Sequence, residues 1–181
     1  MLRLNNKKVI NKMKKNNRQF EKVPKQEIQD ILFIMFGHGD KITSTVEKFV
    51  TDFPYLFTEK EILALKISGG LISDYKGDID LSGIKIQTLG NLKSVGGDLW
   101  LANTAIQSLG NLKSVGGYLN LQHTTIQSLG NLQSVGGYLY LYNSAIQSLG
   151  NLQFVGSNLY LNRHITEISK TLTVKGKIIK P

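Results

Sequence analysis

Six aromatic side chains recur at alternating positions in the second half of the chain, accompanied by carboxylates and amides. Tyr and Trp combine a large apolar ring with one polar atom, which suits them to the centre of a binding surface. The chemistry that we expect of this set is non-covalent binding of a partner. The candidate partner-binding residues are Asp78, Asp80, Asp98, Trp100, Tyr118, Asn120, Tyr138, Tyr140, Tyr142 and Tyr160.

Residue patterns typical of catalysis are missing from the sequence. It contains no Walker loop, no Gly-x-Ser-x-Gly elbow and no Gly-x-Gly-x-x-Gly turn. There is no cysteine, and His38, His123 and His164 have no second ligand at metal-binding spacing. The aspartates of the aromatic set could attract a cation, although loose carboxylates are more often ordinary surface groups. We predict no catalytic residue, no metal site and no cofactor, and therefore no enzyme.

Basic residues are concentrated at the N-terminus. Residues 1–25 hold nine Lys and Arg against Glu21, whereas the other 156 residues carry 13 basic and 12 acidic side chains. Such an arm could neutralise phosphates, although no aromatic platform accompanies it. Binding of nucleic acid or another acidic surface is therefore an alternative function. The candidate anion-binding residues are Lys7, Lys8, Lys12, Lys14, Lys15 and Arg18.

A twenty-residue repeat must position the aromatic set. Ile-Gln-Ser-Leu-Gly-Asn-Leu begins at Ile106, Ile126 and Ile146, and Ile86 begins a variant with Thr in place of Ser. Each copy continues into Val-Gly-Gly-x-Leu-x-Leu, altered to Val155-Gly-Ser-Asn-Leu-Tyr-Leu in the last. A fixed period of this length predicts a solenoid, in which each coil buries its apolar side against its neighbours.

Each coil contains a pair of apolar residues separated by one outward residue, which is the pattern of a short half-buried strand. We expect six such strands in one parallel sheet, with Tyr118 beside Tyr138 and Tyr140 beside Tyr160 at about 4.8 Å spacing. The Gly-Gly pairs predict sharp turns or bulges, and the return side is expected to be extended or 3₁₀. The predicted pairs are Ile79/Leu81, Leu99/Leu101, Leu119/Leu121, Leu139/Leu141, Leu159/Leu161 and a shortened Leu172/Val174.

The frame Leu112-x-x-Val115-x-x-x-Leu119-x-Leu121-x-x-Thr124-x-Ile126 resembles the leucine-rich repeat family. It departs from the family pattern by one extra residue at Gly-Gly and by Thr or Ser in place of the usual Asn. The Gly-Gly form is similar to the variant of bacterial and phage proteins. The resemblance covers about residues 71–180 and implies an interaction scaffold whose concave strand side meets the ligand, without naming that ligand.

Two ladders of identical residues run through the repeats on other sides of the coil. Such ladders most simply hydrogen-bond the turn backbone or stay solvated, so we predict a structural role for them. The strand side is preferred as the binding surface because its residues vary from repeat to repeat, whereas those of the ladders do not. The ladders are Gln87, Gln107, Gln127, Gln147 and Asn91, Asn111, Asn131, Asn151.

Residues 24–70 are predicted to form short helices. Pro24 to Gly37 has proline at a helix start and glycine at its end, and a second helix is expected to open near Thr43. Thr58-Glu-Lys-Glu61 matches a capping box before a third apolar run. The predicted organisation is a mobile basic arm (1–23), a helical cap (24–70) and a leucine-rich repeat solenoid (71–181) of α/β type.

Together these features predict a non-enzymatic protein-interaction module that binds a protein partner on its strand face. Glycan binding on the aromatic face is a further alternative, because rings beside Asp and Asn suit sugars. No apolar run of transmembrane length or signal-peptide type is found, so we expect a cytoplasmic protein that does not interact with membranes. A location in a virion or an infected cell is equally compatible with the sequence.

Overall fold

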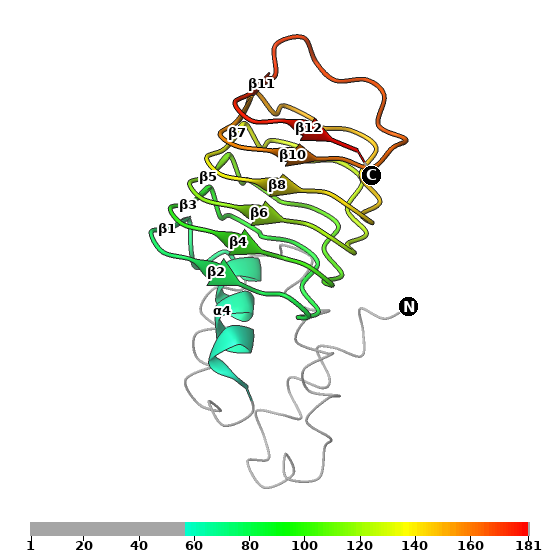
Figure 1. The fold of residues 1–181 in the computed structure, drawn as a ribbon. Coiled ribbons are helices and arrows are strands. Elements are labelled where there is room, and N and C mark those ends of the chain that lie inside the picture. Colours follow the sequence, from blue (N-terminus) through cyan, green and yellow to red (C-terminus); the bar gives the residue numbers. More distant parts are fainter. Residues whose placement is uncertain (1–56, 181) are drawn as a thin grey trace, which may run out of the picture.

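The computed structural model describes residues 57–180 (Figure 1). The predicted arm at 1–23 and the two helices expected between residues 24 and 50 lie outside the described residues. Within the described part of the chain, no helix is long and apolar enough to cross a membrane.

Helix α4 (Glu59–Ser68) confirms the predicted capping box. The Glu61 backbone N–H donates to the Thr58 hydroxyl at 3.2 Å, and the Thr58 N–H donates to the Glu61 carboxylate at 2.8 Å. Leu65 and Ile67 are buried in the same hydrophobic core as the first coils. Figure 1 shows the helix against the N-terminal end of the coils. This helix therefore covers the first coil, as a cap should.

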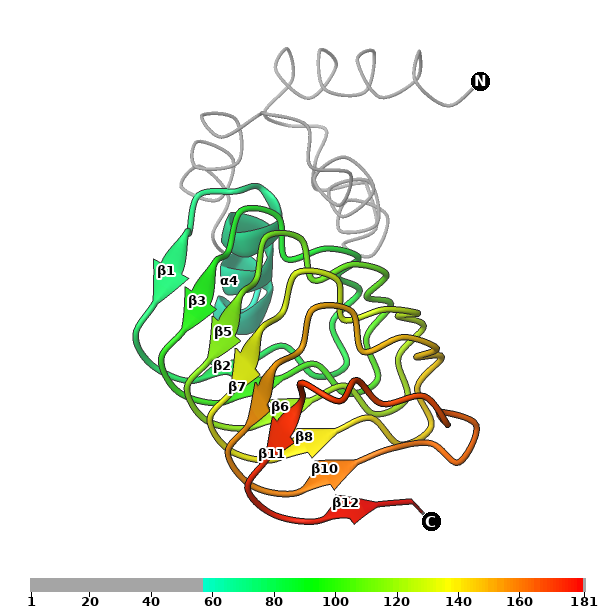
Figure 2. The same ribbon diagram turned by 90° about the horizontal axis from the view of Figure 1, so that it is seen from above.

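A parallel β-solenoid follows, and each coil gives one two-residue strand to each of two six-stranded sheets (Figures 1 and 2). Sheet A contains β1 (Asp74–Tyr75), β3 (Ser94–Val95), β5 (Ser114–Val115), β7 (Ser134–Val135), β9 (Phe154–Val155) and β11 (Thr173–Val174). Sheet B contains β2 (Ile79–Asp80), β4 (Leu99–Trp100), β6 (Leu119–Asn120), β8 (Leu139–Tyr140), β10 (Leu159–Tyr160) and β12 (Ile178–Ile179). The predicted solenoid and the Leu-x-Leu strands of its first five coils are confirmed.

The expectation of a single sheet is wrong, because the return side forms a second one, sheet A; of the two geometries expected there, the extended one is found. The Lys113 N–H donates to the Lys93 carbonyl at 2.8 Å, and the Gly116 N–H donates to the Val95 carbonyl at 2.8 Å. A constant repeat length places all backbone of successive coils in register, so extended segments outside the Leu-x-Leu strands also pair. No 3₁₀ helix is found in residues 57–180.

The sixth Leu-x-Leu pair is a second correction. Val174 of the predicted Leu172/Val174 pair lies in sheet A opposite Val155, and sheet B is completed by Ile178 opposite Leu159. The last coil is one residue shorter than the others, so the twenty-residue period does not locate its strand. The pattern selects the wrong pair because Leu172 and Val174 have the expected spacing, whereas Lys180 stands where the second leucine of the real strand would be.

The repeat leucines form one continuous core, and Leu99, Leu119 and Leu139 are fully buried. Three buried hydroxyls lie at its margin, and each donates to the carbonyl three residues earlier. Thr104, Thr124 and Ser144 make these bonds at 2.7, 2.7 and 2.6 Å. Buried polar groups are stable only when hydrogen-bonded, so these residues close the turn after each sheet B strand.

The Gly-Gly pairs are required by the close approach of neighbouring coils. A Cβ at Gly116 would overlap the Gly96 carbonyl oxygen, and a Cβ at Gly136 would overlap that of Gly116. Their φ angles are negative or extended, whereas Asn103, His123 and Asn143 occupy the left-handed region at φ 58°, 55° and 55°. The chain bends at each glycine pair between its sheet A and sheet B strands, as predicted, and it turns again after the sheet B strand.

Candidate functional site

The outward side of sheet B, here called the strand face, carries the predicted binding residues. On β8, Leu139 is buried while Tyr140 is partly exposed, and the same alternation holds on β10. The register sets Tyr140 between Asn120 and Tyr160. Stacking of coils thus brings residues twenty apart in sequence into contact, as predicted.

Five tyrosines of three neighbouring coils form one cluster on this face, here called the tyrosine cluster. The ring centroids of Tyr140 and Tyr160 are 4.6 Å apart with an interplanar angle of 11°, and those of Tyr138 and Tyr140 are 5.9 Å apart. Edge-to-face contacts extend the cluster, with Tyr118 5.0 Å from Tyr138 and Tyr142 5.4 Å from Tyr160. Both predicted ring pairs, Tyr118 with Tyr138 and Tyr140 with Tyr160, are confirmed.

The rings at the centre of the cluster are partly buried, and its margin is open to solvent. Partial burial raises the pKa of the Tyr140 hydroxyl, and the neighbouring Tyr160 and Tyr138 act in the same direction. The pKa of Tyr142 is raised by burial and by Tyr160. Tyr118 is 42% exposed, so part of its ring is accessible to a partner. The cluster therefore offers neutral hydroxyl groups and apolar ring surface at neutral pH.

The Asp78 and Asp98 side chains connect neighbouring coils at the edge of the strand face. The Asp78 carboxylate accepts the Asp98 backbone N–H at 2.8 Å, and the Asp98 carboxylate accepts the Tyr118 N–H at 2.7 Å. Asn158 repeats the arrangement by accepting the Lys177 N–H at 2.8 Å. Each side chain therefore binds its own coil to the next one, a role that sequence periodicity does not reveal.

Asp80 and Asn120 are also engaged within the chain. Asp80 accepts the Ser82 N–H at 2.8 Å and forms an ion pair with Lys60 of α4 at 3.0 Å. Partial burial of the Asp80 carboxylate raises its pKa, but Ser82 and Lys60 together lower it more. The pKa of Asp80 therefore lies below its usual value. Asn120 accepts the Gln122 N–H at 3.0 Å. These side chains fix the turns and the cap, which leaves the aromatic rings as the available binding groups.

Trp100 lies on the strand face beside Asp80 and Asn120. It is partly buried, and the ring contacts described for residues 57–180 do not join it to the tyrosine cluster. The structure therefore brings five of the six predicted aromatic residues together and leaves Trp100 one strand away.

Two strand-face residues were missed because the last coil is short. Ile179 lies opposite Tyr160, and the Tyr142 hydroxyl donates to the Ile179 carbonyl at 3.5 Å. Lys177 precedes β12 and occupies the position of Asn158 in the previous coil. The Ile178-Ile179 pair, a short β-branched run, was the available signal, but it does not match the repeat spacing.

The asparagine ladder follows the coils on another side of the molecule. The Asn111 side-chain amide donates to the Asn91 side-chain oxygen at 3.4 Å, and the Asn131 amide approaches the Gly110 carbonyl at 3.5 Å. Gln107, Gln127 and Gln147 are exposed, and their backbones pair from coil to coil. The contacts of the asparagine ladder agree with the structural role predicted for it.

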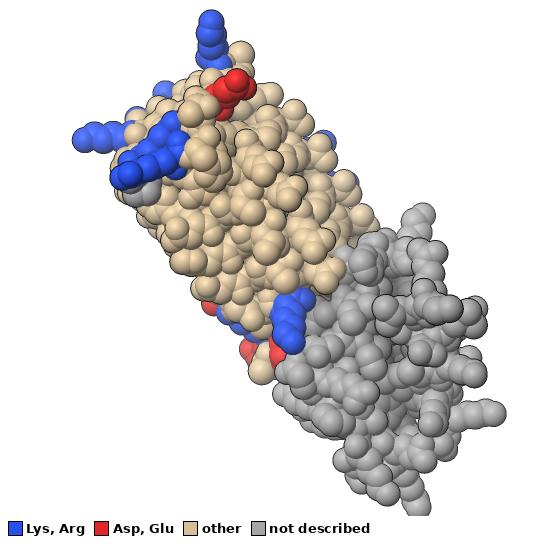
Figure 3. Space-filling model, turned by 90° about the vertical axis from the view of Figure 1, so that its right-hand side faces the viewer, with Lys and Arg blue, Asp and Glu red and all other residues tan. Residues whose placement is uncertain are grey.

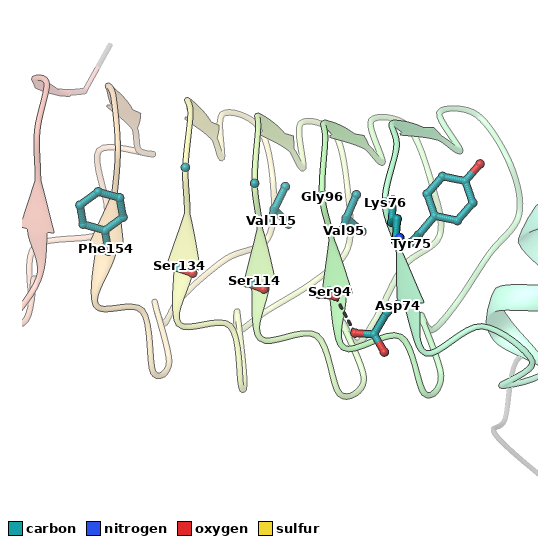
Figure 4. Close-up of a pocket in the computed structure, with 12 residues that line it drawn as sticks. Asp74, Tyr75, Lys76, Ser94, Val95, Gly96, Ser114, Val115, Ser134 and Phe154 are labelled. Atoms are coloured by element: carbon teal, nitrogen blue, oxygen red, sulfur yellow. Dashed lines mark hydrogen bonds between the residues drawn. The ribbon is translucent and has the colours of Figure 1, made fainter.

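A shallow groove of about 420 Å³ crosses the outer side of sheet A (Figure 4). Its floor contains Ser94, Ser114 and Ser134, and Tyr75 and Phe154 lie at opposite ends. The Asp74 carboxylate accepts hydrogen bonds from the hydroxyls of Ser94 at 2.6 Å and Ser73 at 2.7 Å, which hold its pKa low. The floor carries the same residue types from coil to coil, and their chemistry does not indicate a particular ligand. The strand face therefore remains the candidate site.

Within residues 57–180, no three His, Cys, Asp or Glu side chains are grouped so that they could hold a metal ion. Comparisons with protein-family models, curated proteins and solved structures find no match for the chain. A solenoid fold alone does not specify an activity, so function has to be inferred from the chemistry of the strand face.

Proposed function

We propose that this protein is a non-enzymatic interaction module whose strand face binds a protein partner. The tyrosine cluster is the observation that carries the proposal. It gathers five aromatic side chains on one side of a rigid sheet, with Tyr118 42% exposed. Tyr is enriched among residues that dominate protein–protein binding energy, because a large ring with few rotatable bonds is ordered at low entropic cost.

The packing of the rings favours a protein over a glycan or a nucleic acid. Tyr140 and Tyr160 lie face to face, so each covers a face of the other. Sugars and bases bind aromatic residues by stacking on free ring faces. A protein surface can instead use ring edges and hydroxyl groups, which the cluster retains.

We further propose that the solenoid is a leucine-rich repeat scaffold, spanning 71–181 and capped by the 24–70 segment. The buried Leu119 and Leu121 support this, as does Thr124. The Thr124 hydroxyl bonds the Leu121 carbonyl at the position of the usual Asn. A cytoplasmic location belongs to the same proposal.

Nucleic-acid or acidic-surface binding through residues 1–23 is a second candidate, supported by the nine basic residues among the first 25. Deleting these residues would remove salt-sensitive retention on immobilised DNA or RNA. Absence of retention by the intact chain at low salt would eliminate this candidate.

The main proposal is tested by partner capture with the full chain as bait, in a lysate of the cells where it is native. Wild type is compared with Tyr140→Ala/Tyr160→Ala and with a control, Gln107→Ala/Gln127→Ala, on a different side of the coils. Quantitative mass spectrometry should show a protein that is lost with the tyrosine variant and kept with the glutamine variant. Trp100→Ala should weaken capture less, because Trp100 lies apart from the cluster.

Equal capture by wild type and the tyrosine variant would contradict the proposal. Circular dichroism of each variant establishes that the solenoid is intact. Tyr140→Phe/Tyr160→Phe keeps the rings and should retain most capture, which separates ring contacts from hydroxyl contacts.

A further inference from the structure

The tyrosine cluster lies between carboxylates on the N-terminal side of the strand face, such as Asp98, and basic residues on its C-terminal side. From Leu99 to Asn162 the sequence contains one Lys and no Arg, Asp or Glu, whereas residues 163–180 contain five basic residues and Glu167. Figure 3 shows this pattern on the side of the molecule next to the strand face, with an uncharged middle and mostly blue side chains, together with a red one, at the end farthest from the grey residues. The cluster is therefore bordered by a basic coil.

The acidic side chains at the opposite end of the strand face are already used within the chain. Asp78 and Asp98 each accept a backbone N–H from the next coil, and Asp80 pairs with Lys60 at 3.0 Å. Backbone amides and a cation thus occupy oxygens of these carboxylates, which leaves fewer acceptor positions for a partner.

The Lys177 side chain, unlike these carboxylates, is available to a partner. Its backbone N–H is held by the Asn158 side chain at 2.8 Å, which fixes its position beside the cluster. Its side chain is exposed, and no acidic group among the described residues pairs with it. Ile179, opposite Tyr160, continues the apolar surface to this lysine. The exposed Lys175 precedes it by two residues.

We propose that the strand face recognises an acidic polypeptide segment, with its apolar or aromatic side chains on the tyrosine cluster and its carboxylates at Lys177. This inference rests on the proposed function and adds the chemistry of the partner. Charge complementarity at the margin of an interface mainly raises the association rate and selects orientation. The segment therefore binds in one direction, with its acidic end at β12.

The test uses a random peptide library of about twelve residues, which at about 3.3 Å per residue is long enough to cross six strands. The library is selected on the full chain, and peptides that bind Tyr140→Ala/Tyr160→Ala equally well are removed. The Kd of the best peptide is then measured with wild type, Lys177→Glu and the matched control Lys113→Glu. Lys113 is exposed and precedes β5 in sheet A, away from the strand face.

We expect the enriched peptides to carry Asp or Glu close to aromatic or aliphatic residues. Lys177→Glu should weaken binding about tenfold at low salt, and Lys113→Glu less than about twofold, since exposed charges act over about one Debye length. Enrichment of uncharged or basic peptides, or equal effects of the two variants, would overturn this inference and leave the proposed function standing. Tyrosine-independent binding of every peptide would overturn both. Tyrosine-dependent binding of oligouridylate, without any peptide, would assign the surface to nucleic acid.

Discussion

At the residue scale, the strand face divides into side chains that build the coil and side chains that are available to a partner. Asp98 and Asn120 have the polar chemistry of binding residues, yet their oxygens accept backbone N–H groups of this chain. The tyrosines have few such bonds and contact mainly one another. The distinction depends on hydrogen bonds between coils, which residue type and spacing do not reveal.

Replacing Asp98 should therefore affect stability more than binding. Asp98→Ala leaves the Tyr118 N–H without its acceptor and should lower the free energy of unfolding by about 1–2 kcal/mol. Asp98→Asn keeps an acceptor oxygen, as Asn158 does naturally, and should cost much less. Urea unfolding of the two variants measures the difference. An Asp98→Ala variant as stable as wild type would show that this bond contributes nothing.

The raised pKa of Tyr140 predicts a loss of stability in alkali. Its pKa in the folded protein lies above the ordinary tyrosine value of 10.0, so the unfolded chain ionises first as pH rises. The stabilising contribution is complete below about pH 10 and is lost as pH rises towards the folded pKa. Wild type should therefore lose stability relative to Tyr140→Phe above pH 10, with a constant difference below it. Parallel pH profiles of the two proteins would contradict the prediction.

At the element scale, the sequence predicts the strands that alternating leucines mark and misses the strands that lack this alternation. The period and alternation of the leucines located the first five sheet B strands, and hydroxyl and carboxylate spacing located the start of α4. Sheet A was missed because Ser-Val followed by Gly-Gly lacks the alternation that marks a half-buried strand. The sixth sheet B strand was missed because the last coil is one residue short.

The glycine pairs give a prediction at this scale. Gly116→Ala places a Cβ against the Gly96 carbonyl oxygen, so the coils must separate. We expect it to lower the free energy of unfolding by about 1–3 kcal/mol, the usual range for overpacking. Gly77→Ala is the matched control, because its Cβ would lie 3.6 Å from the nearest atom, an ordinary contact with Tyr75. Equal decreases of the melting temperature in the two variants would refute this explanation of the Gly-Gly pairs.

At the scale of the whole molecule, the solenoid is a rigid support for one chemically distinct surface. Coils bonded through two sheets and a continuous core hold the five tyrosines in fixed positions. A preorganised surface loses less entropy on binding than a flexible one. The almost uncharged middle coils and the basic last coil give that surface a direction along the solenoid axis.

The most direct test of the strand face as the binding surface is photo-crosslinking of this protein to its bound partner. A photoreactive phenylalanine analogue is placed at Tyr118 in one variant and at Gln107, an exposed residue of the glutamine ladder, in another. We predict that the captured partner crosslinks to position 118 and not to position 107. Crosslinking from position 107 alone, or equally from both positions, would contradict binding at the strand face.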